Sequence, residues 1–328
     1  MRAAIAAAEV GDEQQNEDPT VACLLTRVCD LLGQEAAIFL PSGTMANEIA
    51  ILVHCRPGDE IVTHELSHVV VGEGGAPAAL AGVLIRSLQG SRGLFTREMV
   101  RQAIRSGSRY QPTSRLVVVE QTANIAGGTV WPFEQLQEVV AEARLHGLAV
   151  HMDGARLMNA SIASGLPPAR YARMFDSVYM DFTKGLGAPL GAVLAGSQDF
   201  VAQAWRWKQR LGGSMRQAGM MAAACLYALD HHVERLREDH ENAGALAALL
   251  AAIPGITVEP VDTNIVFIDV AGVGVSASDF NDALRHRGTR GGIHGATRMR
   301  FVTHLDVSRE QIQTAAGIVA DVASTLRR

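Results

Sequence analysis

The sequence lacks the features that mark membrane proteins, secreted proteins and nucleic-acid-binding proteins. No run of apolar residues reaches the roughly 18 positions that a membrane-spanning helix needs. The 328 residues carry a formal net charge of −5 and no block of basic residues, so neither nucleic acid nor an anionic membrane is an expected partner. The Ala-rich start, from Met1 to Glu9, is too short and too polar at its flanks for a signal peptide.

Cysteine is also scarce. The four cysteines lie far apart and none of them has the spacing of metal ligands, so we expect reduced thiols, a cytoplasmic location and no metal site. With 48% hydrophobic and 19% charged residues, the composition is typical of a globular protein. The cysteines are Cys23, Cys29, Cys55 and Cys225.

What is present is an alternation of strand-like and helical segments. It predicts βαβ units and a mostly parallel sheet. The continuous apolar run Leu116 to Val119 indicates a sheet that is covered on both faces. Helical patterns include residues 19–32 and 132–146. The expected strands are residues 36–40, 60–63, 82–87, 115–120, 148–152, 177–182 and 190–194.

The pattern changes after residue 200. Long helices come first, and a separate α+β pattern follows residue 254, with strands expected near residues 257–260, 263–268 and 298–303. We therefore expect a large domain over 18–227 and, over 228–328, a connector helix with a small C-terminal domain. The N-terminal segment, residues 1–17, is expected to pack with the small domain.

One lysine stands at the end of a strand-like run. Lys184 lies on a turn bracketed by Gly185 and Gly187, with a second apolar run behind it. Loops at strand ends carry much of the chemistry of α/β proteins. Apolar surroundings would desolvate the amine and favour the neutral form, which is the form that makes a Schiff base. The alternative is an exposed surface lysine on a hairpin.

Two further strand ends carry polar groups. Ser42, Gly43 and Thr44 lead from a strand into a helix, where backbone N–H groups and the helix dipole favour an anion, unless the serine or threonine is only an N-cap. Asp153 ends another strand, and Arg156 follows it by three positions. A buried carboxylate stays ionised beside a cation or an N–H donor, so a purely structural pair of these two residues is the alternative.

A histidine and two arginines complete the set of candidates. His68 follows a strand and could stack on a flat cofactor or move a proton, with Glu73 to orient it; a histidine in an ordinary structural hydrogen bond is the alternative. Arg298 and Arg300 alternate along a strand and so share one face. One guanidinium there could bind a carboxylate, or the strand could be a solvent-facing edge.

Together these groups point to one cofactor. An anion-binding turn, a histidine, a strand-end aspartate with an arginine and a strand-end lysine fit an aldehyde that carries a phosphate and a protonated pyridine ring. Pyridoxal phosphate has that structure, and proteins bind it through a lysine Schiff base and an acidic partner of the pyridinium.

The order of these motifs resembles the threonine aldolase family, in the beta-eliminating lyase/threonine aldolase group of fold-type I pyridoxal-phosphate enzymes. The resemblance covers essentially the whole chain. It implies an α/β fold of the aspartate aminotransferase type, with a mostly parallel seven-stranded sheet and a smaller α+β C-terminal domain. The motifs are Glu17-Asp-Pro-Thr20, Pro41-Ser-Gly-Thr-Met45, Ser67-His68, His151-Met-Asp-Gly-Ala-Arg156, Thr183-Lys-Gly-Leu-Gly-Ala-Pro189, Leu211-Gly-Gly-Ser-Met-Arg-Gln217 and Arg300-Phe-Val-Thr-His-Leu-Asp-Val307.

The resemblance implies a cofactor role for most candidates. Lys184 would form the Schiff base, Asp153 would pair with the pyridine nitrogen, and His68 would stack on the ring. The turn of Ser42, Gly43 and Thr44 would hold the phosphate.

The resemblance also implies how the substrate and neighbouring subunits meet the site. Arg156 would lie near the cofactor's phenolic oxygen and the substrate carboxylate, and Arg300 would grip that carboxylate. The family is usually tetrameric, with each active site shared between two subunits. We therefore expect a homo-oligomer, a dimer of dimers, with the Arg216 loop supplied across the interface.

The chain departs from the family at the substrate end of the site. Gln15 stands where a tyrosine is usual, Ala123 where a histidine that contacts the substrate hydroxyl is common, and Gln209 where a lysine is often found. The family usually has a further strand whose serine contacts the substrate, and Met1 falls after it, so a shortened start is expected.

The expected activity is cleavage of a β-hydroxy-α-amino acid, such as threonine, allo-threonine or a phenylserine-like compound, to glycine and an aldehyde. His68 is the candidate base for the β-hydroxyl proton, because Ala123 cannot serve. One alternative is a β-eliminating lyase that acts on a cysteine or serine derivative with the same cofactor. A second alternative is a non-catalytic paralogue that kept the fold.

Overall fold

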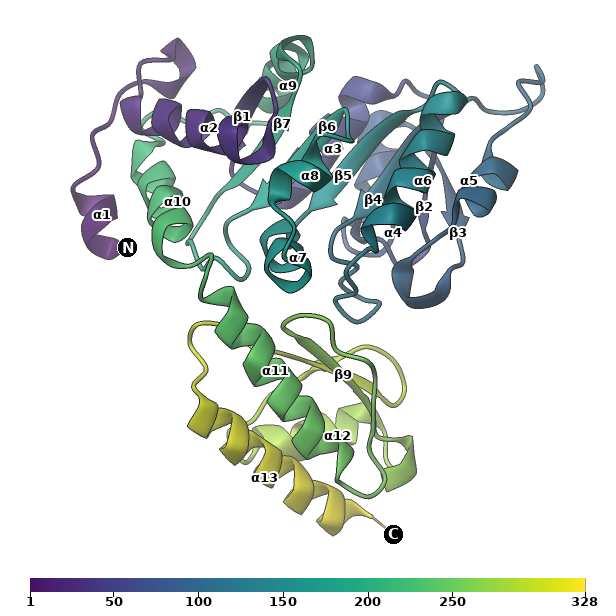
Figure 1. Cartoon of the computed structure of the whole chain (residues 1–328), viewed down its shortest axis with the longest axis vertical. Helices are drawn as coiled ribbons and strands as arrows, with labels where there is room; N and C mark the ends of the chain where they lie inside the picture. Colours follow the sequence, from purple (N-terminus) through teal and green to yellow (C-terminus); the bar gives the residue numbers. More distant parts are fainter. Residues whose placement is uncertain (328) are drawn as a thin grey trace. The chain divides into compact units, whose positions relative to one another are not determined.

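The computed structural model describes residues 1–327, and the chain forms two compact units. The first unit contains residues 1–123 and 131–233, and the second contains residues 124–130 and the chain from Glu234 onward. The part of the second unit from Glu234 onward is drawn from green to yellow in Figure 1.

The first unit is built on a seven-stranded sheet with the order β1-β7-β6-β5-β4-β2-β3. The pairs β3–β2, β2–β4, β4–β5 and β5–β6 are parallel, whereas β7 runs antiparallel to β6 and β1. The predicted seven-stranded, mostly parallel sheet is therefore confirmed. The strands are β1 (Ala36–Leu40), β2 (Glu60–His64), β3 (Leu84–Leu88), β4 (Ser114–Glu120), β5 (Ala149–Gly154), β6 (Ser177–Asp181) and β7 (Ala192–Gly196).

Helices cover both faces of this sheet, as the apolar central strands require. In Figure 1, α6 (Phe133–Leu145) and α8 (Pro168–Ala172) lie in front of the sheet, and α3 (Gly43–His54) lies behind it. The other helices of the unit are α1 (Arg2–Ala6), η1 (Glu13–Gln15), α2 (Pro19–Leu32), α4 (His68–Val71), η2 (Pro77–Ala81), η3 (Ser91–Gly93), α5 (Arg97–Ala103), α7 (Leu157–Ser164), α9 (Gln198–Arg210) and α10 (Gly219–His231).

Helix α2 begins and ends at the residues that its local sequence specifies. Asp18 is the N-cap and accepts hydrogen bonds from the backbone N–H groups of Thr20 and Val21, and Pro19 takes the first helical position. Gly33 ends the helix with φ of 65°, a left-handed conformation that favours glycine. The buried side chains Val21, Leu24, Val28 and Leu32 recur at helical spacing.

The prediction that residues 1–17 pack with the small domain is wrong. This segment belongs to the first unit, where α1 packs against α10. The Glu13 carboxylate is buried and accepts from Lys208 Nζ and from the backbone N–H of Met215. Helix α1 has no buried residue, and the polar bonds of Glu13 help to attach the segment to the first unit.

The second unit is a smaller α+β structure. Its four-stranded antiparallel sheet has the order β10-β11-β9-β8, and α11 and α13 pack against each other. The predicted continuous connector helix is interrupted, because α10 ends at His231 and the next helix begins at Leu236. The elements are α11 (Leu236–Ala251), β8 (Thr257–Val258), β9 (Ile265–Asp269), η4 (Ala271–Val273), α12 (Ala277–Arg285), β10 (Gly292–Ile293), β11 (Arg298–Val302) and α13 (Arg309–Leu326).

A short early segment also belongs to the second unit. Residues 124–130 come between two stretches of the first unit in sequence. Thr263 Oγ1 donates to Gly128 O at 3.0 Å, and the backbone N–H of Val130 donates to Asp262 Oδ2 at 3.1 Å. These bonds, rather than sequence order, decide where the segment lies.

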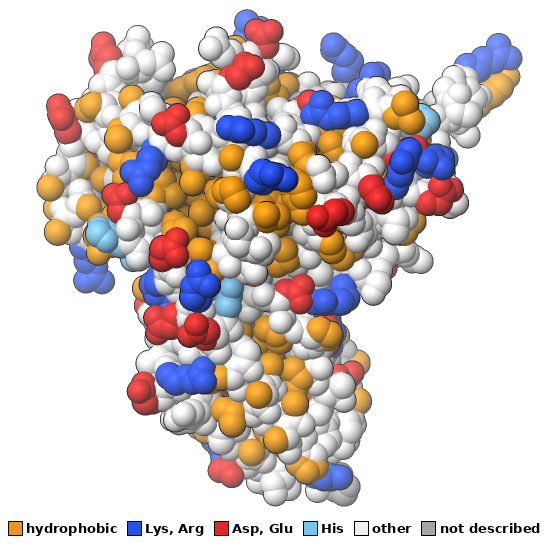
Figure 2. Space-filling model, in the orientation of Figure 1, with side chains coloured by type: hydrophobic (Ala, Val, Ile, Leu, Met, Phe, Trp, Pro, Cys, Tyr) orange, Lys and Arg blue, Asp and Glu red, His pale blue; other side chains and the backbone are white. Residues whose placement is uncertain are grey.

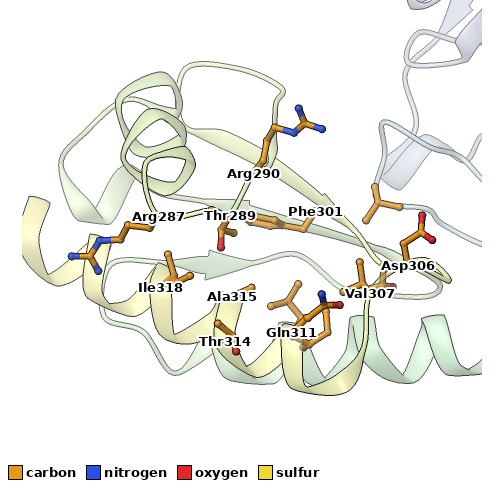
Figure 3. A pocket seen from close by; sticks show the side chains of 15 residues that line it. Arg287, Thr289, Arg290, Phe301, Asp306, Val307, Gln311, Thr314, Ala315 and Ile318 are labelled. Atoms are coloured by element: carbon orange, nitrogen blue, oxygen red, sulfur yellow. The ribbon is translucent and has the colours of Figure 1, made fainter.

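The second unit contains a pocket of about 400 Å³ beside α13 and β11 (Figure 3). Arg287, Arg290, Phe301 and Ile318 are among the residues that line it. None of the predicted site residues is among its lining residues.

The surface agrees with the composition. On the face drawn in Figure 2, acidic and basic side chains are interspersed over the molecule. Within residues 1–327, none of the helices combines the length and the apolar character that crossing a membrane would require.

Candidate active site

The site is built on the side chains that β4, β5 and β6 present to one face of the sheet. Asp153 of β5 is in register with Glu120 of β4 and with Tyr179 of β6. Two residues earlier, His151 is in register with Ser177. Because side chains alternate along a strand, these five residues share one face. Helix α3 packs against these three strands and supplies further polar groups.

Asp153 is a buried carboxylate held by N–H donors. It is 1% exposed, and its Oδ2 accepts from Asn47 Nδ2 at 2.8 Å and its Oδ1 from the backbone N–H of Ala155 at 3.1 Å. Burial raises the pKa of Asp153, and the nearby Glu73 raises it further. The hydrogen bonds to this carboxylate come from Asn47 and Ala155, so the simple structural pair with Arg156 is not what holds it.

His68 lies beside Asp153 and is oriented by a glutamate. Its Nδ1 is 2.8 Å from Glu73 Oε1, and its backbone N–H donates to Glu120 Oε2 at 3.1 Å. The hydrogen bond to Glu73 raises the pKa of His68 above its usual value. A carboxylate partner requires the proton on Nδ1, so Nε2 is the nitrogen that can accept one. A Cβ on Gly72 would lie 2.6 Å from that nitrogen, so glycine leaves space for the ring.

Lys184 follows β6 and is held by Asp181. Lys184 Nζ is 3.2 Å from Asp181 Oδ2, and its backbone N–H donates to Asp181 Oδ1 at 3.1 Å. Tyr179 Oη also donates to Oδ2 at 2.8 Å. The Lys184 side chain is 39% exposed, so the expected desolvation of this amine by the chain is wrong. Its strand-end position is as predicted, but an anionic partner rather than apolar surface contacts it.

Arg156 is buried among acidic groups. It is 8% exposed, and within the described chain its Nε is a buried donor that lacks a hydrogen-bond partner. Desolvation lowers the pKa of this guanidinium, while Glu120, Asp181 and Asp153 act in the opposite direction. A buried donor without a partner is what an incoming anionic or polar group would satisfy.

The predicted phosphate turn lies at the start of α3, a helix of 12 residues. Ser42 is its N-cap, and its Oγ accepts from the backbone N–H of Met45 at 3.3 Å. A Cβ at position 43 would lie 2.0 Å from Tyr179 Oη, so only glycine fits there. Ser42 and Thr44 are exposed, and a helix N-terminus directs backbone N–H groups outward. Ser42 is therefore a cap, and its contact with a phosphate stays a prediction, as does that of Thr44.

Arg300 lies in the second unit, on β11. Its Nη1 donates to Asn124 Oδ1 at 2.7 Å. The neighbouring Arg298 forms a two-bond ion pair with Glu259 and stacks on Phe267 at 3.6 Å. Because β11 pairs with both β10 and β9, the solvent-facing edge strand that we considered is wrong. The role of Arg300 toward a substrate carboxylate stays a prediction.

The positions that depart from the family pattern lie in varied surroundings. Ala123 is 4% exposed, Gln15 closes η1, and Gln209 is exposed on α9. Lys208, the residue before Gln209, is fully buried and paired with Glu13.

A chain of hydrogen bonds behind Asp153 was missed in the sequence. His54 Nε2 is 2.8 Å from Ser177 Oγ, which is 2.8 Å from His151 Nδ1, and His151 Nε2 is 3.1 Å from Asn47 Oδ1. Burial lowers the pKa of His54 to about 4 and that of His151 to about 3, so both are neutral. The only signal was polar residues on an otherwise apolar helix and strand, which do not reveal their partners.

This neutral chain fixes the amide of Asn47. With Oδ1 toward His151, Asn47 Nδ2 faces both Asp153 Oδ2 and Glu73 Oε1, each at 2.8 Å. His68, Glu73 and Asp153 have side-chain atoms within 4.8 Å of one another, and these hydrogen bonds connect them. The expectation that the site binds no metal stays a prediction.

The groups present fit pyridoxal phosphate. A buried carboxylate can hold a ring N–H, an amine stands at a strand end, and a helix N-terminus offers N–H groups to a phosphate. The unpartnered Nε of Arg156 is a further donor for a polar ligand. The sheet with these groups at its carboxyl edge defines the class of pyridoxal-phosphate enzymes with this α/β fold.

Comparisons with known proteins give the family. The family model described as beta-eliminating lyase matches residues 1–272. The chain is 38% identical over 317 residues to a low-specificity L-threonine aldolase of Escherichia coli, covering 96% of this chain and 93% of the relative. A low-specificity L-threonine aldolase of Arabidopsis thaliana is 37% identical over 319 residues, covering 95% and 89%.

Solved structures show the same fold. A threonine aldolase of Leishmania major superposes with a TM-score of 0.80 at 22% identity, covering 94% of this chain and 90% of that chain. A serine palmitoyltransferase of Sphingomonas wittichii gives a TM-score of 0.77 at 18% identity, covering 99% and 82%.

The chain therefore belongs to the threonine aldolase family, within the beta-eliminating lyase group of fold-type I pyridoxal-phosphate enzymes. The predicted family, fold and lyase class are confirmed.

Proposed function

We propose that this enzyme cleaves a β-hydroxy-α-amino acid, such as threonine, allo-threonine or a phenylserine-like compound, to glycine and an aldehyde. The observation that carries the proposal is the grouping of Asp153 and His68, bridged by Asn47 and Glu73, in a chain with close relatives named as low-specificity L-threonine aldolases. Family membership supplies the reaction class, and the site supplies an acid–base pair for it.

Pyridoxal phosphate, when bound, supplies the electron sink for the charge that remains at Cα after the Cα–Cβ bond breaks. Lys184 would hold the cofactor through its amine. Asp153 would hold a proton at the ring nitrogen. The start of α3, with Ser42, Gly43 and Thr44, would bind the phosphate through N–H groups and hydroxyls.

The substrate side of the proposal uses His68 and two arginines. His68 Nε2 would take the proton of the β-hydroxyl, while Glu73 keeps the other ring nitrogen protonated. Arg156 and Arg300 would hold the substrate carboxylate, since a guanidinium can donate two parallel hydrogen bonds to it. Interactions that become stronger as charge develops in the transition state are the ones that accelerate the reaction.

The proposal includes an assembly. We propose a homo-oligomer, a dimer of dimers, in which the Arg216 loop of one subunit serves its neighbour's site. The Arg216 side chain is 59% exposed and pairs with Asp12, so it is within reach of solvent and of another chain. Light scattering of the purified protein should give a multiple of the chain mass, and a monomer would contradict this part. A cytoplasmic location is also proposed, supported by four cysteines that are all free thiols.

The test is absorbance followed by product analysis. The purified protein with pyridoxal phosphate is expected to show the visible band of a lysine-bound cofactor and to release glycine and an aldehyde from L-threonine or phenylserine. Lys184→Ala should remove the band and at least about 99% of the activity. The control is Arg206→Ala, which changes an exposed residue. The nearby Lys208 is unsuitable as a control position because it is buried.

A second candidate is a β-eliminating lyase, favoured by the description of the matching family model. It differs in the bond that breaks, since elimination needs the Cα–H bond to break first. Pyruvate and ammonia from cysteine, without glycine from threonine, would select it. A band that survives Lys184→Ala, or no band at all, would overturn the role of Lys184 that both activities share. A band without either activity would indicate the non-catalytic paralogue.

A further inference from the structure

Within the described chain, three buried carboxylate oxygens of Glu48 and Glu73 lack a hydrogen-bond partner. Glu48 lies on α3 and is 2% exposed, and within residues 1–327 both its oxygens lack a hydrogen-bond partner. Within the same residues, Glu73 Oε2 is also buried and lacks a hydrogen-bond partner. An unpaired buried carboxylate oxygen loses the hydration that it has in water, so three of them together are costly.

One proton shared between the two carboxyl groups would give a partner to two of these three oxygens. The two carboxyl groups lie within interaction range of each other, and two ionised carboxylates there would repel. Burial, with the neighbouring Glu73, raises the pKa of Glu48 to about 9, so Glu48 is the group that keeps the proton at neutral pH. A protonated carboxyl has an O–H donor, which the ionised form lacks.

Glu73 is the neighbouring charge that acts on the Glu48 carboxyl. Glu73 is the only titratable residue between Gly72 and Gly82, the segment that includes η2, which packs on α3. The charges that face His68 are Asp153, Glu73 and Glu120.

We propose that Glu48 is a neutral carboxylic acid that donates its O–H to Glu73 Oε2 and so acts as a positioning residue for His68. Glu73 then accepts on both oxygens, from Glu48 on one side and from Asn47 and His68 on the other. Held in this way, Glu73 stays an ionised acceptor and keeps the proton of His68 on Nδ1. This inference rests on the proposed function in one respect only, namely that His68 acts as the base for the β-hydroxyl proton.

The O–H bond also moderates the basicity of Glu73. A donor to Oε2 stabilises the negative charge of Glu73, which reduces the attraction of Glu73 for a charged imidazolium. Loss of that donor should therefore raise the pKa of His68 and leave its Nε2 a less available proton acceptor at neutral pH.

The first test is a titration of the wild-type protein without cofactor or substrate. The side-chain carboxyl carbon of Glu48, followed by ¹³C NMR, should keep its protonated chemical shift from about pH 5 to about pH 8 and change only in the alkaline range. A Glu48 resonance that titrates below about pH 6 would overturn the proposal. This measurement needs no variant and no activity.

The second test compares two substitutions of similar volume. Glu48→Gln keeps an N–H donor for Glu73, whereas Glu48→Leu removes the donor. We expect Glu48→Leu to raise the pKa of His68 by about half a unit, seen in its ring ¹⁵N resonances, and Glu48→Gln to leave it nearly unchanged. In cleavage assays near neutral pH, Glu48→Leu should lower kcat by up to about threefold with KM nearly constant, and Glu48→Gln should stay close to wild type.

The outcomes separate this inference from the function itself. Equal His68 titrations in all three proteins would overturn the positioning role, whether or not the protein cleaves threonine. If the titrations behave as expected while no substrate is cleaved, the proton on Glu48 stands and the proposed function fails. If Glu48→Leu does not fold, the smaller Glu48→Ala, which also removes the donor, takes its place, and the wild-type titration still decides whether Glu48 holds the proton.

Discussion

At the scale of single residues, Asn47 connects the two halves of the site. Its Nδ2 lies 2.8 Å from both Asp153 Oδ2 and Glu73 Oε1, and its orientation is set by His151. One amide therefore holds the carboxylate proposed for the cofactor ring and the carboxylate that orients His68.

We predict that Asn47→Leu weakens pyridoxal phosphate binding roughly tenfold or more, because two buried carboxylates lose a donor. Titration of the cofactor-free protein, followed by absorbance, measures this. Val53→Ala, a partly buried change near the end of the same helix, is the matched control and should bind normally. An unchanged Kd in a correctly folded Asn47→Leu protein would show that the bridge is dispensable.

The residue scale is also where the sequence was least informative. Lys184, Asp153 and His68 could be predicted because each follows a strand, and the carboxyl ends of parallel strands meet at one edge. Glu48 and His151 could not, because their partners are far away in sequence and only the register of β5 with β6 and the packing of α3 bring them together.

At the scale of elements, one carboxylate joins three segments. Asp18 caps α2 through Oδ1, and its Oδ2 accepts from the backbone N–H groups of Gly219, at the start of α10, and Gly11. The cap thus holds the N-terminal segment against two helices.

Asp18→Ala should lower the free energy of unfolding by about 2–4 kcal/mol, about 1 from the lost cap and the rest from N–H groups left unpaired. Urea denaturation followed by circular dichroism gives this value. Asp30→Ala, an exposed position on the same helix, should change it by less than about 0.5 kcal/mol. Similar losses in both variants would contradict the role of the cap.

Helices and strands were predicted better than the contacts of single residues or the organisation of the two units. The bounds of α2 and β1 follow from local signals, namely Pro19, Gly33 and a short apolar run. The short strand β10 and helices α7 and α8 were missed, because their patterns are brief and their stability comes from neighbours rather than from the segment itself.

At the scale of the whole molecule, unfolding in acid should report on Glu142. Hydrogen bonds from Arg101 and Arg97 lower the pKa of this carboxyl from 4.5 to about 2. A depressed pKa in the folded state stabilises the fold above the unfolded pKa, and that stability is lost as the pH falls toward about 2.

Glu142→Gln should therefore melt roughly 2–4 °C below wild type at neutral pH, and the difference should shrink as the pH falls below about 4.5. Thermal melts at a series of pH values test this. Glu138→Gln, an exposed change on the same helix, should melt with wild type throughout. A gap that is constant with pH would rule out the linkage.

Whole-molecule organisation was predicted only in outline. The two-part division was expected, but the first unit extends to Val233 and takes in residues 1–17. The membership of residues 124–130 could not be predicted, because it depends on bonds to Asp262 and Thr263, more than 130 positions later.

The assignment of residues 124–130 to the second unit limits how this chain can be divided. The chain passes between the two units three times, after Ala123, after Val130 and after Val233. A fragment that starts at Glu234 would lack Asn124 and Gly128, the partners of Arg300 and Thr263. No single cut of the chain leaves both units complete, because each unit consists of two separate stretches of sequence. Truncation, domain exchange and split-protein designs must therefore keep the chain as one piece.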